Sequence, residues 1–540
     1  MDGDTYDYII IGSGSAGSIV ASRLTEFFPN KKILLIEAGS NDNKLTVNIP
    51  AGYGYLFKNS NVNWKYYTEE IKGLNNRRDY WPKGKILGGS SSINAMVYIR
   101  GQQNDYDNWK IKNWTWNDLF PYFLKIENHY LGKTPNHNDN GKIKISNIDK
   151  EKHKLTDEFI NTCVNLGIRR NNDFNGSYQE GVGLYQLNTN NGKRSSTSKE
   201  YLNKIKNKKN FYLLTSSHVS KIIFEGNTAT GVEYIKEDKK YLVNCNHEII
   251  LSAGSIASPQ ILQLSGVGDM EYLKNFNIKE VKHLKYVGNN LQDHPNVALH
   301  YKTNIKSLND DLRPLTKKIY FFLKWLLFKS GPLKLSINQA GAFVKSSNSI
   351  NNPDLQIYFL PLTATNLSKS ANASVTPDPF SGITIAPSIL RPKSRGYVKI
   401  QSLDPFDQPL INPNYYDDYD DLLLMLKAYK ISKQIADTQP LNSFIDEKIG
   451  PHKNINSENE IINFIKLYSK TTYHPVGTCK MGISESDSVV DCNLKVHGIK
   501  NLRIADGSIM PNLISGNTNS ACMMIGEKCS DIIRNNYENI

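Results

Sequence analysis

Paired cysteines are missing from this chain of 540 residues. Its six cysteines are isolated, and none stands in a Cys-x-x-Cys pair or at the spacing of a Cys/His metal site. The sequence therefore predicts neither a disulfide framework nor a bound metal ion. A secretory signal is also missing, because the opening MDGDTYDYIIIG carries acids where such a signal carries positive charge. We therefore expect an intracellular, cytoplasmic protein.

The sequence also lacks an apolar run long enough to span a membrane. The longest such run covers residues 319–328 (IYFFLKWLLF); Lys324 interrupts it, and it is too short to cross a bilayer. We expect a core helix or a lid here, with contact to a membrane surface as the alternative.

Aromatic residues are missing from the densest basic run, although the net charge is +13. The densest run, KIKNKK at residues 204–209, has no interleaved aromatic side chain of the kind that stacks on nucleic-acid bases. We interpret it as a solvated turn before a strand. Nucleic acid is therefore not an expected partner, and the charge pattern leaves the oligomeric state open.

The first forty residues alternate between strand and helix patterns. Residues 6–11 form a short β-branched run, residues 18–28 have a helical pattern, and residues 32–36 form a second apolar run. This βαβ order predicts a parallel sheet with a right-handed crossover.

The pattern changes in the second half of the chain. Alternating strands such as residues 355–360 and 397–400 mix with amphipathic helices such as residues 420–437. This mixture predicts an antiparallel sheet covered by helices. Parallel-type signals return at residues 502–505, and a last helix follows over residues 520–534.

These shifts predict a discontinuous first domain. It consists of residues 1–294 and 467–540, with some excursions that help to form the pocket, and it is α/β. An α+β domain of residues 295–466 is inserted into it and should carry the substrate pocket.

A glycine-rich turn joins the first strand to the first helix. Gly12 allows the tight turn, Gly14 and Ser15 let the backbone approach a pyrophosphate, and Gly17 lets helix and strand pack closely. Glu37 ends the second strand, where a carboxylate can accept hydrogen bonds from ribose hydroxyls. The unit predicts a bound dinucleotide but does not separate FAD from NAD.

Four longer motifs resemble those of a known family, and this resemblance distinguishes FAD from NAD. In order and spacing they resemble the signatures of the glucose–methanol–choline (GMC) oxidoreductases, over nearly the whole chain. Within that family, the general pattern is most similar to choline dehydrogenases and aryl-alcohol oxidases. The motifs are residues 84–94 (GKILGGSSSIN), 254–268 (GSIASPQILQLSGVG), 287–295 (VGNNLQDHP) and 473–478 (YHPVGT).

The resemblance implies FAD as cofactor and a Rossmann-like FAD-binding domain of the glutathione-reductase type. It also implies contacts of the flavin with the Gly-Gly loop, of the adenine end with one strand, and of the pyrophosphate with a late loop. The residues at these positions are Gly88, Gly89, Ser90 and Asn94, then Val219, then Asp506 and Gly507.

One position departs from part of the family. Some members attach FAD covalently through a histidine two residues after a serine of the Gly-Gly loop. This chain has Ile93 there, and a hydrocarbon side chain cannot form that bond. We therefore expect non-covalent FAD.

Oxidation of an alcohol requires a base for the hydroxyl proton and a polar group that holds the oxygen. The resemblance implies that His474 is the base and Asn517 its partner, with Asn519 as the alternative if the register shifts. An asparagine can donate to the substrate oxygen without competing as a base. Helix capping is the other interpretation of this asparagine-rich segment.

Three other histidines have no catalytic role in this interpretation. The resemblance makes His294 a structural residue of its turn, and His218 and His497 belong to the scaffold. An acid near Gln339 is typical of choline-type members, so its absence argues against choline.

The sequence thus predicts an FAD-dependent oxidoreductase that converts a small alcohol into an aldehyde or ketone. The electron acceptor is dioxygen or another molecule. Two alternatives stay open: a lyase on the same fold, as in the hydroxynitrile lyases of this family, and a flavin-bearing binding or structural protein.

Overall fold

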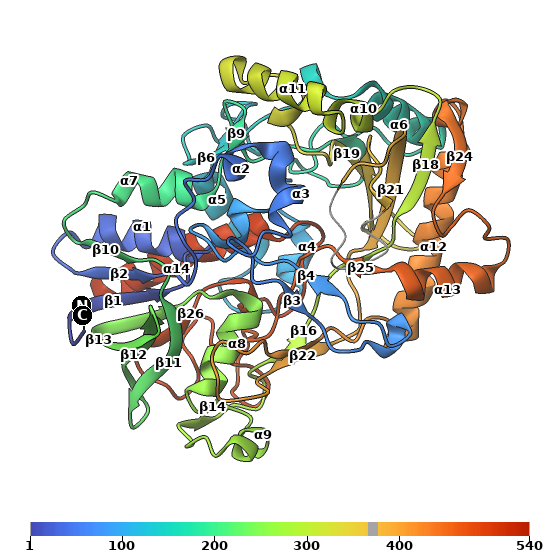
Figure 1. The fold of residues 1–540 in the computed structure, drawn as a ribbon. Coiled ribbons are helices and arrows are strands. Elements are labelled where there is room, and N and C mark those ends of the chain that lie inside the picture. Colours follow the sequence, from blue (N-terminus) through green and yellow to red (C-terminus); the bar gives the residue numbers. More distant parts are fainter. Residues whose placement is uncertain (1, 366–375, 539–540) are drawn as a thin grey trace.

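The computed structural model describes residues 2–365 and 376–538. In this part of the chain, two large β-sheets lie side by side, one mixed with seven strands and one antiparallel with eight (Figure 1). Both termini lie at the outer end of the mixed sheet (Figure 1).

The mixed sheet contains the predicted βαβ unit. β1, β2, β10, β13 and β26 pair in parallel, and β11 and β12 extend the sheet as antiparallel strands beside β13. Its strands are β1 (Thr5–Ile11), β2 (Ile33–Ile36), β10 (Phe211–Leu214), β11 (His218–Glu225), β12 (Thr228–Lys236), β13 (Lys239–Leu251) and β26 (Leu502–Ile504).

Both β1 and β2 are buried almost throughout, which explains their continuous apolar runs in a parallel sheet. Helix α1 (Gly17–Phe27) follows β1 and packs against the last helix, α14 (Asn519–Glu538). Helix α8 (Gly254–Leu264) follows β13. Three helices therefore begin near the carboxyl ends of sheet strands, where open α/β sheets bind their ligands.

The antiparallel sheet has the strand order β24-β18-β21-β20-β19-β7, and β17 and β25 extend it. Helices α6 (Lys154–Asn165) and α12 (Tyr419–Ala436) pack against it. Its strands are β7 (Gly181–Leu184), β17 (Pro295–Asn296), β18 (Leu299–Thr303), β19 (Ala340–Val344), β20 (Leu355–Leu360), β21 (Gly382–Ile389), β24 (Ile445–Ile449) and β25 (Lys470–Thr471).

The predicted domain division at residue 295 coincides with the start of β17. However, α6 and β7 precede that point and still pack into the antiparallel sheet, because β7 pairs with β19. This segment is an excursion of the first domain into the second. We retain the division as a proposal.

Most of the remaining elements are short, and they connect or cover the two sheets. These are α2 (Leu45–Asn48), α3 (Tyr53–Leu56), β3 (Tyr66–Tyr67), β4 (Tyr80–Trp81), α4 (Gln103–Asp107), α5 (Trp116–Ile126), β5 (Glu127–His129), β6 (Ile143–Ile145), β8 (Thr189–Asn190), β9 (Lys193–Arg194), α7 (Asn203–Ile205), β14 (Val267–Gly268), α9 (Met270–Leu273), β15 (Lys282–His283), β16 (Asn289–Leu291), α10 (Leu308–Leu312), β22 (Gly396–Lys399), β23 (Leu410–Asn412) and α13 (Glu458–Tyr468).

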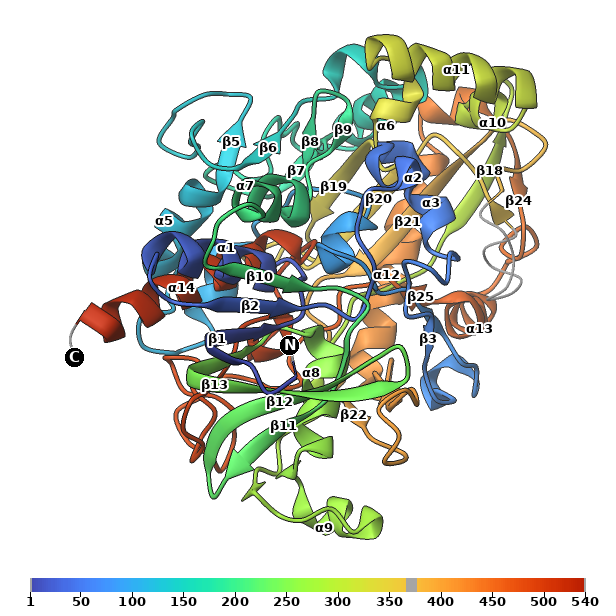
Figure 2. The ribbon, with the colours of Figure 1, turned by 60° about the vertical axis from the view of Figure 1, so that its left-hand side comes forward.

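The apolar run at residues 319–328 belongs to helix α11 (Leu315–Phe328). We expected a core helix or a lid, but only Phe321 and Trp325 of this helix are buried. It lies along one edge of the molecule, and both ribbon views place it at the top (Figures 1 and 2). The core assignment was wrong because the sequence pattern does not show which apolar residues find a partner. Among the described residues, no helix is long and apolar enough to cross a membrane.

Candidate active site

A cavity of about 480 Å³ lies between the two sheets. One part is lined by the glycine turn after β1, the end of β2 and the starts of α8 and α14. The other part is lined by the antiparallel sheet and by the segment that contains His474. The elements thus divide the cavity into a nucleotide end and a substrate end.

The glycines after β1 are required by close backbone contacts. A Cβ on Gly12, whose φ is +96°, would lie 2.6 Å from the backbone oxygen of Ser252. A Cβ on Gly17 would lie 2.0 Å from the oxygen of Gly12. Gly14 is different: a Cβ there would approach the protein no closer than 3.9 Å, and Gly14 lines the cavity. Gly12 and Gly17 therefore shape the turn, and Gly14 and Ser15 leave room for a ligand.

Glu37 lines the cavity directly after β2, as predicted. Its Oε2 accepts hydrogen bonds from Ser13 N at 2.9 Å and Ser13 Oγ at 2.6 Å, and its Oε1 accepts from Gly39 N at 2.7 Å. Burial raises the pKa of this carboxyl. Since a carboxylate can accept about four hydrogen bonds, capacity remains for a ribose hydroxyl.

The Gly-Gly loop packs on the glycine turn. A Cβ on Gly89 would lie 2.7 Å from Gly14 Cα, so the two backbones touch where a side chain would separate them. Gly89, Ser90 and Asn94 line the cavity. Gly88 does not line it; Gly88 N donates to Ser13 Oγ at 3.3 Å and supports the loop from behind.

Asp506 and Gly507 also line the cavity, but the Asp506 carboxylate is used within the protein. It accepts from Gly254 N at 2.8 Å and Ser258 Oγ at 2.6 Å at the start of α8, and from Ser508 N at 2.8 Å. Asp506 thus fixes the N-terminus of α8 at the cavity wall. That helix end was not predicted as a ligand site, although its sequence lies within the motif at residues 254–268.

Val219 lies at the far side of the nucleotide end, where His218 and Pro405 also line the cavity. His218 Nε2 donates to the Pro405 carbonyl at 3.0 Å, so this histidine connects two segments of the wall.

His474 and Asn517 come together at the substrate end. Asn517 Nδ2 lies 3.1 Å from His474 Nε2. The amide oxygen of Asn517 is buried and has no hydrogen-bond partner among the described residues. Because an unpartnered buried acceptor is costly, this atom indicates a position for a ligand.

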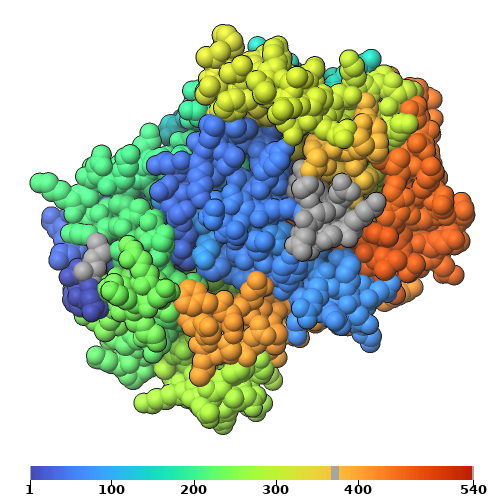
Figure 3. All heavy atoms as spheres, in the orientation of Figure 1, coloured from blue at the N-terminus to red at the C-terminus, as the bar shows by residue number. Residues whose placement is uncertain are grey.

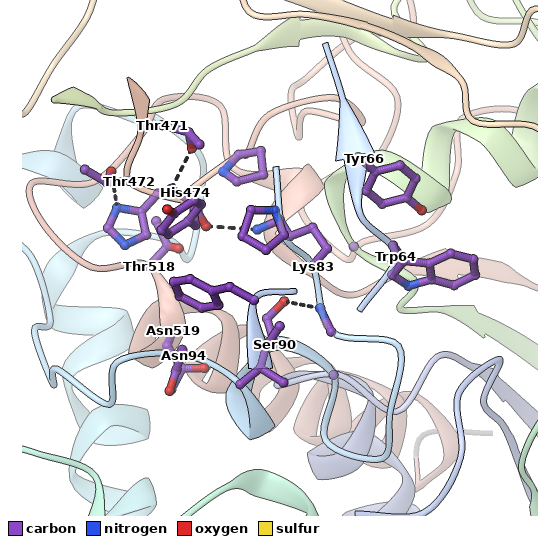
Figure 4. A pocket seen from close by; sticks show the side chains of 18 of the residues that line it. Trp64, Tyr66, Lys83, Ser90, Asn94, Thr471, Thr472, His474, Thr518 and Asn519 are labelled. Atoms are coloured by element: carbon purple, nitrogen blue, oxygen red, sulfur yellow. Dashed lines mark hydrogen bonds between the residues drawn. The ribbon is translucent and has the colours of Figure 1, made fainter. Parts of the chain in front are cut away.

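The alternative residue, Asn519, is engaged elsewhere. Its Oδ1 accepts from Ser15 Oγ at 2.6 Å, which connects the start of α14 to the glycine turn. Figure 4 shows Asn519 together with Asn94, apart from His474. The geometry therefore pairs Asn517 with His474 and places Asn519 at the nucleotide end.

His294 contacts His474 directly, which the sequence did not predict. The two Nδ1 atoms are 3.0 Å apart, and His294 Nε2 lies 2.9 Å from the Leu390 carbonyl oxygen. A carbonyl only accepts, so His294 Nε2 carries a proton. Burial lowers the pKa of His294 to about 4, so its ring is neutral and its Nδ1 is an acceptor.

These contacts define the tautomer of His474. Its Nδ1 donates to His294 Nδ1 and faces Thr472 Oγ1 at 2.9 Å (Figure 4). The Thr472 hydroxyl donates its own proton to the His294 carbonyl oxygen at 2.9 Å, so at His474 it accepts. The unprotonated nitrogen of His474 is therefore Nε2, on the side of Asn517.

Burial, followed by His294 and Lys83, lowers the pKa of His474 well below its usual 6.5. The Asp293 carboxylate accepts from His474 N at 2.7 Å and fixes the backbone. Lys83, which lines the cavity, has its own pKa lowered to about 8 by burial, and its Nζ donates to the Tyr473 carbonyl at 2.9 Å. His474 is thus neutral at pH 7.

One face of the antiparallel sheet forms the wall opposite these residues. Side chains two apart along β20 and β21 line the cavity, as expected for one face of a strand. The lining residues of this wall are Asn296, Ala298, His300, Tyr358, Leu360, Thr384 and Ala386.

Gln339 does not line the cavity, although its neighbours Ile337 and Asn338 do. Its Oε1 accepts from His153 N and Thr156 Oγ1, both at 2.8 Å, on the side of α6. An acid at Gln339 itself would therefore not face the substrate, and the neighbouring lining positions, Ile337 and Asn338, carry no acid either.

Comparison with known families agrees with this architecture. The N-terminal model of the GMC oxidoreductases matches residues 6–296, and the C-terminal model matches residues 392–526. The chain therefore belongs to the GMC oxidoreductase family, and it is an FAD-dependent oxidoreductase of the class that acts on CH–OH donors.

Relatives are similar over most of their length. The chain is 37% identical to alcohol dehydrogenase [acceptor] of Pseudomonas putida over 535 residues, 98% of this chain and 95% of the relative. It is 36% identical to the mitochondrial choline dehydrogenase of Mus musculus over 543 residues, 98% of this chain and 90% of the relative.

Solved structures share the fold. Pyridoxine 4-oxidase from Mesorbium loti superposes with a TM-score of 0.88 at 29% identity, covering 99% of each chain. A formate oxidase variant of Aspergillus oryzae RIB40 superposes with a TM-score of 0.92 at 25% identity, covering 100% of each chain. In that formate oxidase, the FAD is subject to modification.

Proposed function

We propose that this protein oxidises an uncharged, largely apolar alcohol to an aldehyde or ketone. The observation that carries the proposal is the unprotonated Nε2 of His474 beside Asn517, at the substrate end of the cavity. The Nε2 lone pair accepts the Asn517 Nδ2–H in this structure, and when a substrate hydroxyl takes that place the neutral imidazole can take its proton.

The nucleotide end suits FAD. Gly14 leaves space for a ligand next to the starts of α1, α8 and α14, and helix starts favour phosphate. Gly89 lets the Gly-Gly loop pack against Gly14 at this end of the cavity. Glu37 lies where it can accept from a ribose hydroxyl. When bound, FAD supplies the group that accepts the hydride from the substrate carbon.

The chain's own residues perform the proton step. His474 Nε2 accepts the hydroxyl proton, and the Nδ2–H of Asn517 donates to the substrate oxygen as its negative charge grows. His474 Nδ1 keeps its proton through its contacts with His294 and Thr472. The low pKa of His474 keeps the base available at neutral pH.

The lining favours an uncharged substrate. Among the lining residues that the structure describes, the acids are Glu37 and Asp506, and both belong to the nucleotide end. A trimethylammonium group would need a facing carboxylate or an aromatic cage. The substrate end presents side chains of Ala298, Leu360 and Ala386 and also aromatic rings such as Tyr358 and Tyr473, so the missing carboxylate is what argues against a cationic substrate. The alcohol dehydrogenase of Pseudomonas putida is thus a better guide to the substrate than the choline dehydrogenase relative.

We also propose that FAD is held without a covalent bond to the Gly-Gly loop, because Ile93 lines the cavity there. Flavin should stay in the supernatant when the holoprotein is precipitated with acid, and yellow precipitate would contradict this. The acceptor is proposed to be dioxygen or another oxidant.

Anaerobic mixing of the holoprotein with single alcohols tests the function. We expect aliphatic and benzylic primary alcohols to bleach the flavin absorbance, and choline at equal concentration to bleach it far more slowly. Peroxide on admission of air would identify dioxygen as the acceptor. Reduction by choline but by no uncharged alcohol would contradict the proposal. A flavin that no alcohol reduces would contradict alcohol oxidation as a whole.

A further inference from the structure

Helix α11 exposes an apolar face that no described element covers. Seven of its apolar side chains are exposed, and Leu327 and Phe328 at its end are 69% and 73% exposed. In Figure 3 the helix forms the upper edge of the molecule. The exposed apolar residues are Leu315, Ile319, Tyr320, Leu323, Leu326, Leu327 and Phe328.

The exposed residues form one stripe. At about 100° per residue, Ile319, Leu323 and Leu327 fall close together, and Tyr320 and Leu326 lie on either side of them. The opposite face holds Phe321 and Trp325, which are buried. The apolar character of the outer stripe is thus not needed to pack the helix on the protein.

The inner face attaches the helix firmly. Trp325 is 1% exposed, and its Nε1 donates to the Gly192 carbonyl at 2.6 Å. Lys329 Nζ lies 4.3 Å from the centre of the Trp325 ring and donates to the Leu326 carbonyl at 2.7 Å. The outer stripe is therefore presented on a fixed helix.

Lysines border the stripe on both sides. By the same angular spacing, Lys317 and Lys324 fall on one flank and Lys318 on the other. Lys329 ends the helix in a left-handed conformation, and its ammonium is used on the inner face. The helix sequence contains no Asp or Glu. Asp311, in the preceding helix α10, pairs with Lys317 at 3.4 Å. An apolar stripe with lysines on both flanks is typical of helices that lie in the headgroup region of a bilayer.

The helix also lies close to the substrate end of the cavity. Leu308 and Leu312 of α10, which directly precedes α11, pack in one cluster with Ile337 and Leu362. Ile337 and Leu362 both line the cavity. A membrane in contact with α11 would therefore lie near the end of the cavity where an apolar substrate is expected.

We propose that the outer face of α11 docks the protein on an anionic lipid bilayer, with the helix parallel to the membrane plane. The leucines enter the boundary between headgroups and acyl chains, and the lysines contact anionic headgroups. A protein surface would not require this arrangement of cations on both flanks. The docking holds whichever alcohol the enzyme oxidises.

Sedimentation of the FAD-loaded protein with vesicles tests the proposal. The wild-type protein should bind vesicles of phosphatidylcholine with phosphatidylglycerol, and bind those of phosphatidylcholine alone more weakly. Leu323→Gln/Leu327→Gln should lower the partition coefficient at least about tenfold. Lys318→Gln/Lys324→Gln should lower it about thirtyfold at low salt, and this difference should shrink at high salt.

The matched control is Leu242→Gln/Ile483→Gln. Both residues are exposed apolar side chains outside α11, and this variant should bind like wild type. The thermal midpoint and the flavin content of each variant show that it is folded. If the wild-type protein does not bind anionic vesicles, the proposal is overturned. It is also overturned if the Leu323→Gln/Leu327→Gln variant binds them as well as wild type does. A third outcome is that wild type forms a dimer, does not bind vesicles, and dissociates when Leu323 and Leu327 are replaced. This outcome would assign the face to a second copy of the chain, and it also overturns the proposal.

Discussion

The proton on His474 Nδ1 is held by two neighbours, and each depends on a further contact. His294 accepts because its other nitrogen is committed to the Leu390 carbonyl. Thr472 accepts because its hydroxyl proton is committed to the His294 carbonyl. The orientation of the base therefore depends on backbone oxygens that do not touch the substrate.

Replacing His474 tests the base. His474→Ala should keep FAD bound, because His474 contacts none of the residues that shape the nucleotide end. Flavin reduction by alcohol should fall about 10²- to 10⁴-fold, the usual contribution of a positioned base. Stopped-flow reduction and the absorbance of bound flavin measure the two effects. Near wild-type reduction would remove His474 from this role.

Replacing His294 tests the tautomer. His294→Phe removes the acceptor for His474 Nδ1–H, so part of the molecules should carry the proton on Nε2 instead. We expect kcat/KM to fall about 10- to 100-fold, largely through kcat, with a shifted acidic limb of the pH profile. Wild-type protein should keep a flat kcat/KM down to about pH 6.5, because the pKa of His474 is lowered below that value.

Thr472→Ser is the matched control, because it keeps the hydroxyl that faces His474. Its kcat and pH profile should stay close to those of wild type. If His294→Phe lowers stability but leaves the pH profile unchanged, His294 has only a structural role.

At the scale of elements, the glycine turn is the segment that the sequence predicted best. Local rules were sufficient there, because Gly12 and Gly17 are each required by a contact within one strand–turn–helix unit or with its neighbouring strand. Helix α11 shows the opposite case. Its apolar residues follow a helical period, but the sequence could not show that most of them have no partner in the fold.

Two glycine replacements should distinguish a glycine that shapes the turn from a glycine that leaves room for FAD. Gly12→Ala places a Cβ 2.6 Å from the Ser252 oxygen at a φ of +96°, so the turn must move and the thermal midpoint should fall. Gly14→Ala meets no protein atom closer than 3.9 Å, so the fold should persist while FAD binds more weakly. Thermal unfolding and flavin titration of the apoprotein measure the two effects. Equal loss of stability in both variants would contradict this distinction.

At the scale of the whole molecule, buried histidines connect stability to pH. Burial lowers the pKa of His294 to about 4, of His300 to about 3 and of His452 to about 4, each from 6.5. Between these values and pH 6.5 the unfolded chain binds more protons than the native protein. The free energy of unfolding should therefore decrease as pH falls below about 6.5, by up to about 1.4 kcal/mol per histidine and pH unit.

Asp293 acts in the other direction, because burial raises its pKa from 3.8 to about 6. The native protein then binds the extra proton, and stability rises as pH falls through 6. Among the described residues, seven histidines have a lowered pKa, and they outnumber the four carboxyls with a raised pKa, which are Glu37, Asp79, Asp105 and Asp293. The urea midpoint should therefore be lower at pH 5 than at pH 7, and an equal or higher midpoint at pH 5 would contradict the assignment.

The sequence by itself determined the βαβ unit, the dinucleotide turn and the family. Each depends on residues close together in the chain or on motifs in a fixed order. Only the tertiary structure decided that Asn517 rather than Asn519 meets His474, that His294 holds its tautomer, and that Gln339 faces away from the cavity. Those facts depend on side-chain direction between segments far apart in sequence. The exposed face of α11 was decided in the same way, since burial depends on what the rest of the chain packs against it.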